Sequence, residues 1–144
     1  MRLALKQARL AFEAGEVPVG AVVVHAGEVA GAGSNRTRRD CSVAAHAEIV
    51  ALIEAERKAG DFRLDDAVMY VTVEPCLMCL GAMQQARIGR VVYGAAEPKS
   101  GALGGRFDLR GHEALRKLKI VSGVLAEDAA GLMGEFFAGL REGA

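Results

Sequence analysis

Two short clusters of residues, 30 positions apart, constrain this chain more than any other feature of it. The first cluster is His46-Ala47-Glu48, and the second is Pro75-Cys76-Leu77-Met78-Cys79. Imidazole nitrogen and thiolate sulfur are ligands that Zn²⁺ prefers, and a catalytic zinc site uses three protein ligands and keeps a fourth position for water. Each cluster is a weak signal alone. Together they predict one Zn²⁺ per chain, bound by His46, Cys76 and Cys79.

Both clusters are predicted to lie at the start of a helix. Apolar residues recur with helical spacing over 44–58, and a second helix is predicted over 76–87. The N-terminus of a helix carries unpaired N–H groups and the positive end of the dipole, which favour thiolate over thiol. Glu48 comes two residues after His46, a spacing that does not share one helix face. We therefore expect Glu48 to lie beside the metal's water as the catalytic acid–base group.

Other interpretations of the two clusters stay open. His46 could be an ordinary residue of a helix start. Cys76 and Cys79 could be a redox pair, although a thioredoxin-like pair follows a βαβ unit near the N-terminus. The metal could be purely structural, and its fourth ligand would then come from the remaining cysteine and histidines, Cys41, His25 and His112. A structural site has no use for Glu48, which favours catalysis.

Length and composition indicate one ordinary globular domain over residues 1–144. The chain is 51% hydrophobic and 25% charged, with 18 basic and 18 acidic residues. No apolar run approaches the roughly 20 residues that span a bilayer, and charges interrupt the first residues where a secretory signal would be apolar. We therefore expect a cytoplasmic protein with no membrane contact. Because the charge is balanced, a nucleic-acid partner would have to meet a local basic patch or one shared through a dimer.

Strands and helices alternate along the chain after an initial hairpin. The predicted strands cover 21–24, 29–32, 68–73, 91–93 and 119–121, and the predicted helices cover 1–14, 44–58, 76–87 and 126–140. An arginine-rich loop over 33–43 and a Gly-rich loop over 95–111 separate some of them. Long loops in compact domains are commonly functional. This order predicts an α/β layered domain with a mixed sheet.

The pattern H-x-E followed by P-C-x-x-C is the known signature of zinc-dependent base deaminases. On these residues and their flanks, the chain resembles the cytidine-deaminase-like superfamily. Within that superfamily it is similar to the bacterial tRNA-specific adenosine deaminases. The similarity covers nearly the whole chain. The segments that carry it are 16–21, 35–36, 45–48, 74–79, 81–83, 87–95, 99–102, 122–125 and 136–137.

The resemblance implies a three-layer α/β/α domain around a central mixed sheet of about five strands. It implies hydrolytic conversion of adenosine to inosine at the wobble position of a tRNA anticodon stem-loop. It also implies a homodimer whose sites receive residues from both subunits. A flipped base is held in a snug pocket by hydrogen bonds and apolar contacts.

The same resemblance assigns substrate contacts to matching positions. Asn35 would hydrogen-bond the flipped base, and Val17 and Ala45 would line its pocket. In the 95–111 loop, Lys99 and Ser100 would meet the anticodon backbone. The remaining implied contacts are to nucleotides that flank the target, and they are assigned to Glu97, where the family usually has Asp, and to Phe137 and Arg141.

Two further functions stay open beside tRNA deamination. One is deamination of a free base or nucleotide of the guanine or cytosine type. The other is a zinc-stabilised RNA-binding or scaffolding protein without catalysis. Arg36, Arg38 and Arg39 favour a partner that bears phosphate. Asn35 could also be a turn residue, and Val17 and Phe137 could be core residues.

Overall fold

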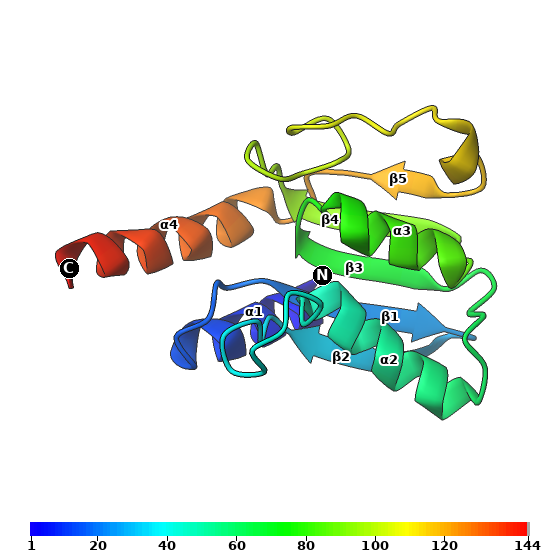
Figure 1. The fold of residues 1–144 in the computed structure, drawn as a ribbon, viewed down its shortest axis with the longest axis horizontal. Helices are drawn as coiled ribbons and strands as arrows, with labels where there is room; N and C mark the ends of the chain where they lie inside the picture. The colour runs from blue at the N-terminus through cyan, green and yellow to red at the C-terminus, as the bar shows by residue number, and fades with distance from the viewer. Residues whose placement is uncertain (144) are drawn as a thin grey trace.

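The computed structural model describes residues 1–143. Five strands form one mixed sheet in the order β2-β1-β3-β4-β5 (Figure 1). The first three strands of this order are antiparallel: β1 (Gly20–His25) lies between β2 (Glu28–Ser34) and β3 (Val68–Val73) and runs opposite to both. On the other side of β3, β4 (Arg90–Ala95) and β5 (Lys119–Val121) add parallel strands. The predicted mixed sheet of about five strands is confirmed.

Four helices cover the two faces of the sheet. On one face, α2 (Ala47–Ala59) packs mainly on β1 and β2 and lies beside α3 (Leu77–Gln85). On the other face, α1 (Arg2–Glu13) packs on β1 and β2, and α4 (Ala126–Glu142) packs on β3 and β4. In Figure 1, α2 and α3 lie in front of the sheet, and the end of α4 extends beyond it. The predicted three-layer α/β/α domain is therefore confirmed.

Glycines in β2 allow α2 to approach the sheet closely. A Cβ at Gly31 would collide with the carbonyl of Ala51, and a Cβ at Gly33 would collide with the carbonyl of Ala47. Both alanines are fully buried in α2. Because neither strand nor helix has a bulky side chain here, the backbones pack together directly. The position of α2, and hence of its first turn, is fixed by this contact.

Several element boundaries differ from those predicted. The second helix begins at Ala47, not at residue 44, because its cap His46 is extended with φ −70° and ψ 150°. The fourth strand runs to Ala95 because its pairing with β3 continues as far as Val73. A short 3₁₀-helix, η1 (Glu113–Leu115), lies in a region where none was predicted. In the described part of the chain, no helix is long and apolar enough to cross a membrane.

Candidate metal centre and active site

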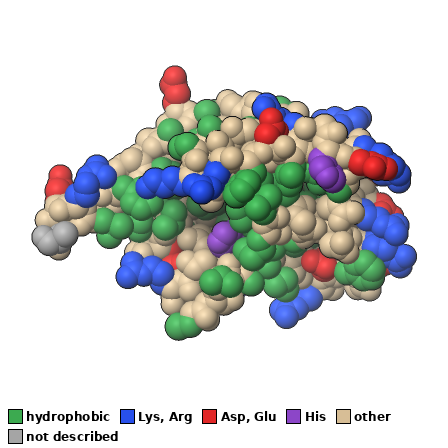
Figure 2. Space-filling model, turned by 45° about the horizontal axis from the view of Figure 1, so that its top comes forward, with side chains coloured by type: hydrophobic (Ala, Val, Ile, Leu, Met, Phe, Trp, Pro, Cys, Tyr) green, Lys and Arg blue, Asp and Glu red, His purple; other side chains and the backbone are tan. Residues whose placement is uncertain are grey.

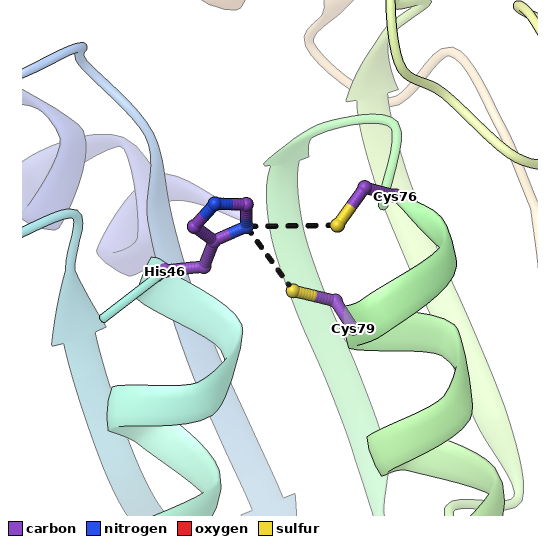
Figure 3. Close-up of side chains that lie close together, drawn as sticks. All are labelled: His46, Cys76 and Cys79. Atoms are coloured by element: carbon purple, nitrogen blue, oxygen red, sulfur yellow. Dashed lines mark hydrogen bonds between the residues drawn. The ribbon is translucent and has the colours of Figure 1, made fainter. Parts of the chain in front are cut away.

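The topology of the sheet brings the two sequence clusters together. Both β2 and β3 run opposite to β1, so they run in the same direction and end at the same edge of the sheet. The chain enters α2 and α3 from that edge. His46 is the N-cap residue of α2, Cys76 is the N-cap residue of α3, and Cys79 lies in the first turn of α3. Figure 3 shows the three side chains pointing toward one another from these two helix starts.

The spacing of the three side chains fits a metal ion. His46 Nδ1 lies 3.6 Å from Cys76 Sγ and 3.5 Å from Cys79 Sγ. Zn–N and Zn–S bonds of normal length, meeting at a tetrahedral angle, would separate nitrogen and sulfur by about 3.6 Å. Within residues 1–143, these three residues are the group that could hold a metal, and no fourth side chain joins them. The arrangement therefore fits a catalytic site better than a closed structural one.

The alternative fourth ligands lie elsewhere. Cys41 is exposed, and its thiol contacts the carbonyl oxygen of Arg38 at 3.6 Å. His25 is the last residue of β1. His112 caps η1, where its Nδ1 accepts a hydrogen bond from the Ala114 N–H. Each of the three lies outside the cluster.

Cys76 and Cys79 differ in acidity. A hydrogen bond from the Cys79 thiol, helped by one from His46, lowers the pKa of Cys76 to about 4. The same bond and burial raise the pKa of Cys79. The bond to Cys76 raises the pKa of His46. Such a group already holds one thiolate, the form that binds a metal.

Glu48 is buried beside these residues. Its side chain is 4% exposed, and burial raises its pKa above the usual value for glutamate. No arginine or lysine pairs with it among the ion pairs of residues 1–143. A buried carboxyl group with a raised pKa is suited to taking up and releasing a proton near neutral pH.

A hollow of about 220 Å³ opens over the cluster. Its lining includes Glu48 together with His46 and Cys76. Asn35 lies in the same lining and is almost completely buried. The Asn35 amide nitrogen donates to the carbonyl oxygen of Val17 at 3.3 Å, whereas the amide oxygen has no hydrogen-bond partner within residues 1–143. A buried acceptor without a partner is rare, and this one is available to a ligand.

The other predicted substrate contacts divide into three groups. Val17, Glu97 and Ser100 line the hollow over the three possible metal ligands. Lys99 and Phe137 line a neighbouring hollow of about 280 Å³, between the 95–99 segment and α4. The remaining two residues, Ala45 and Arg141, line neither hollow.

Two buried glutamates that were not predicted as functional border the same region. Glu16 is 2% exposed and accepts hydrogen bonds from the backbone N–H groups of Arg38 and Arg39. Glu74 is 5% exposed and accepts three backbone hydrogen bonds from the 97–105 segment. Each adjoins an apolar stretch of sequence, and a charged residue at such a place is a signal for a buried, functional carboxylate.

Comparison with known proteins identifies the chain. A family model for MafB19-like deaminases matches residues 1–141. The chain belongs to this deaminase family. Because the match includes both clusters, the metal-centre residues of the structure lie inside the region that defines the family. The predicted resemblance to deaminases is confirmed.

Curated relatives of this deaminase are found among tRNA-modifying enzymes. A tRNA-specific adenosine deaminase from Bacillus subtilis is 41% identical over 143 residues, which is 99% of this chain and 89% of that protein. A tRNA(Ile)-lysidine synthase from Deinococcus radiodurans is 49% identical over 139 residues, which is 96% of this chain and 24% of that protein. The deaminase thus spans about a quarter of the length of that synthase.

Solved structures of two kinds of deaminase resemble the chain. A structure from a study of A-to-I editing by tRNA:A34 deaminases at the wobble position of transfer RNA has a TM-score of 0.87 and 41% identity, with coverage of 92% of this chain and 96% of that one. A guanine deaminase from Nitrosomonas europaea has a TM-score of 0.81 and 25% identity, with coverage of 94% and 81%. The similarity to tRNA adenosine deaminases is the stronger of the two.

Proposed function

We propose that this deaminase converts adenosine to inosine at the wobble position of a tRNA anticodon loop. The observation that carries the proposal is the single hollow that joins His46, Cys76, Glu48 and the unpartnered oxygen of Asn35. It brings a metal site, an acid–base group and a base-binding acceptor to one place. The tRNA-specific relative at 41% identity supports the choice of substrate.

We assign one Zn²⁺ to His46, Cys76 and Cys79. The donor set and the nitrogen–sulfur distances of 3.5 and 3.6 Å fit this ion. When bound there, zinc supplies Lewis-acid chemistry that brings the pKa of a water molecule to about 7. The positive ends of α2 and α3 meet at the site and stabilise the thiolates.

Glu48 moves the protons of the reaction. Its carboxylate takes a proton from the attacking water and delivers it to the adjacent ring nitrogen as the C–O bond forms. It then carries the remaining proton of the added hydroxyl group to the amino group, so that the C–N bond breaks, ammonia leaves and the C–O bond becomes a carbonyl. Burial raises the pKa of Glu48 above the usual value for glutamate, which brings it closer to the pKa that suits a group that both takes up and releases protons.

Asn35 and the surrounding side chains hold the base. The free Asn35 oxygen can accept a hydrogen bond from an N–H of a flipped base, and Val17 supplies an apolar wall. Glu97 and Ser100 border the same hollow from the 95–111 loop. Lys99 and Phe137 border the adjoining hollow, where a flanking nucleotide can stack and bring its phosphate near a positive charge.

The proposal is tested with a panel of substrates and a pair of variants. The zinc-loaded protein is expected to form inosine in an anticodon stem-loop and to leave free guanine and cytosine unchanged. Glu48→Gln is expected to keep zinc and lose activity by about 10²–10⁴-fold. Glu54→Gln changes an exposed glutamate of the same helix and is the matched control. An active Glu48→Gln variant would refute the proton-transfer role.

A guanine deaminase is the second candidate, favoured by the solved structures of that class. The hollow of about 220 Å³ is large enough for a single base. The exposed Arg38 and Arg39 beside it are more useful for a phosphate-bearing substrate than for a bare base. Consumption of free guanine without conversion of the stem-loop would decide in favour of this candidate.

We also propose that the protein works as a homodimer. The outer sides of α2 and α3 expose large apolar side chains, among them Ile53, Leu77 and Met78. In Figure 2, hydrophobic side chains gather across the middle of the visible face, with Lys and Arg side chains mostly around them. A second copy would cover this surface beside the metal centre. Sedimentation is expected to give a dimer, and Ile53→Glu is expected to give a monomer.

The cytoplasmic location stays a prediction.

A further inference from the structure

The carboxylate of Glu74 is buried at the end of β3, next to the Pro75-Cys76 step that leads into α3. Glu74 Oε1 accepts a hydrogen bond from the Glu97 N–H at 3.1 Å. Glu74 Oε2 accepts hydrogen bonds from the N–H groups of Leu103 and Gly105, both at 2.9 Å. No ion pair within residues 1–143 includes Glu74. Backbone N–H groups are therefore the hydrogen-bond donors to this buried carboxylate.

The 97–105 segment is wound tightly around this carboxylate. A Cβ at Gly101 would collide with the Glu74 carboxylate itself, and a Cβ at Gly105 would lie 2.9 Å from Glu74 Oε2. The segment also contacts the residues that follow β3. The Ala102 N–H donates to the carbonyl oxygen of Pro75 at 3.0 Å, and Gly101 forms a β-bridge with Cys76. The carboxylate thus forms the centre of a compact loop that is fastened next to a metal ligand.

This loop forms one wall of the site. Glu97 and Ser100 line the hollow over the three possible metal ligands, and Lys99 lines the adjoining hollow. We infer that Glu74 is a positioning residue for deamination: its carboxylate fixes the 97–105 loop and thereby places Glu97, Lys99 and Ser100 against the nucleic acid. The inference rests on the proposed function for the identity of the substrate.

The number of donors explains why a carboxylate is required. Three N–H groups converge on two oxygens, and a carboxylate has acceptor sites on both. Glutamine has the same shape but only one acceptor oxygen, so its NH₂ group would face at least one N–H donor. Glu74→Gln should therefore release part of the loop while the rest of the site keeps its shape.

A second buried glutamate, next in sequence to Val17 of the hollow's lining, offers a matched control. Glu16 binds the backbone N–H groups of Arg38 and Arg39 at 3.1–3.2 Å, in the loop that leads toward His46. It is as deeply buried as Glu74 but holds a different loop. Glu16→Gln should therefore disturb the 38–39 backbone and leave the 97–105 backbone unchanged.

Amide hydrogen exchange on the zinc-loaded protein tests the loop contact without using activity. Glu74→Gln is expected to speed exchange at Leu103 and Gly105 by about 10-fold, with no change at Arg38 and Arg39. Glu16→Gln is expected to give the reverse pattern. Unchanged exchange at Leu103 and Gly105 in Glu74→Gln would overturn the inference, whichever substrate the enzyme uses.

Steady-state kinetics test the consequence for the reaction. With an anticodon stem-loop, Glu74→Gln is expected to raise KM by about 10-fold and to lower kcat less, with one zinc per chain retained. A purely structural role would instead lower zinc content and kcat together and leave KM unchanged, and that result would overturn the inference. Asp108→Asn, an exposed carboxylate of the same region that contacts Arg110, is the control with unchanged KM.

A second variant probes the same contact if Glu74→Gln does not fold. Gly101→Ala keeps the Glu74 carboxylate and places a methyl group between it and the backbone carbonyl of Glu97, the two groups that the loop holds together. Like Glu74→Gln, it is expected to raise KM and to speed amide exchange at Leu103. Failure of the wild-type protein to convert the stem-loop would count against the proposed function, whereas the exchange experiment would still decide the role of Glu74.

Discussion

His46 Nδ1 lies 3.5 Å from Cys79 Sγ although 33 positions separate the two residues in the chain. The contact exists because β2 and β3 run in the same direction and deliver α2 and α3 from one edge of the sheet. It joins the hairpin half of the domain to its parallel half. The candidate metal centre therefore depends on the packing of β2 and β3 against β1.

Cys79→Ala is expected to remove zinc from the protein, and Cys41→Ser is expected to keep it. Cys79 belongs to the cluster of three possible metal ligands, whereas Cys41 is exposed and lies outside it. The measurement is the metal content of the purified variants, with about one zinc per chain in the wild type. Loss of zinc from Cys41→Ser would mean that the ligand set assigned to the metal is incomplete.

Chelation of the metal is expected to make Cys76 the more reactive of the two metal-site cysteines. Cys76 is half-buried, whereas Cys79 is fully buried in the core. Treatment with iodoacetamide followed by peptide mass spectrometry should label Cys76 first after chelation and neither cysteine before it. Cys41 should be labelled under both conditions because it is exposed. Equal labelling of Cys76 with and without chelator would contradict the assigned site.

Asn35→Ala is expected to lower kcat/KM for the stem-loop by about 10–100-fold while zinc stays bound. The variant removes the unpartnered acceptor of the pocket and frees the Val17 carbonyl oxygen from its donor. Steady-state kinetics and metal analysis of the same preparation check both parts. Wild-type kinetics in Asn35→Ala would exclude a base contact at this position.

Lys99→Ala is expected to weaken binding of the stem-loop and to reduce its salt dependence. Lys99 is exposed beside the hollow next to the site. Loss of one phosphate contact should lower the slope of log K against log salt by about 0.7–0.9. Lys117→Ala, an exposed lysine at the opposite end of the strands, is the control with an unchanged slope. Equal slopes in Lys99→Ala and the wild type would place the RNA elsewhere.

Gly31→Ala is expected to destabilise the fold by about 1–3 kcal/mol and to weaken zinc binding. Its new methyl group would collide with the Ala51 carbonyl and push α2 away, together with His46 at its start. Gly131→Ala in α4 meets open space and should instead stabilise by about 0.5–1 kcal/mol. Urea unfolding and competition with a chelator measure the two effects. If Gly31→Ala lowered the free energy of unfolding but still bound zinc tightly, zinc affinity would not depend on the packing of α2 against β2.

The metal centre was predictable from sequence because its chemistry needs particular residue types. Few combinations other than a metal site explain His46, Glu48, Cys76 and Cys79 at these spacings, and the structure brings His46, Cys76 and Cys79 together as a group that could hold a metal. The alternation of strands and helices followed from hydrophobic periodicity. Helix starts were harder to place, since the extended backbone of His46 is set by its tertiary position and not by local propensity.

The roles of Glu16 and Glu74 could not be predicted in the same way. Their partners are backbone N–H groups 22 to 31 positions away, and backbone groups leave no mark on the residue types of a sequence. Ala45, by contrast, was predicted as a substrate contact. The family resemblance suggested that Ala45 lines the base pocket; in the structure its carbonyl oxygen accepts a hydrogen bond from the Arg36 N–H, and it is not among the residues that line the hollow.

The location of the metal ligands at the starts of two helices has a mechanical consequence. A metal that joins His46 to Cys76 closes a loop of about 30 residues, as a cross-link would. For a covalent bridge of that span, the loss of freedom in the unfolded chain is worth about 3–4 kcal/mol. The ion that serves the reaction would therefore also cross-link the two halves of the sheet and raise the free energy of unfolding. Removal of the metal would then lower the stability of the fold as well as the activity.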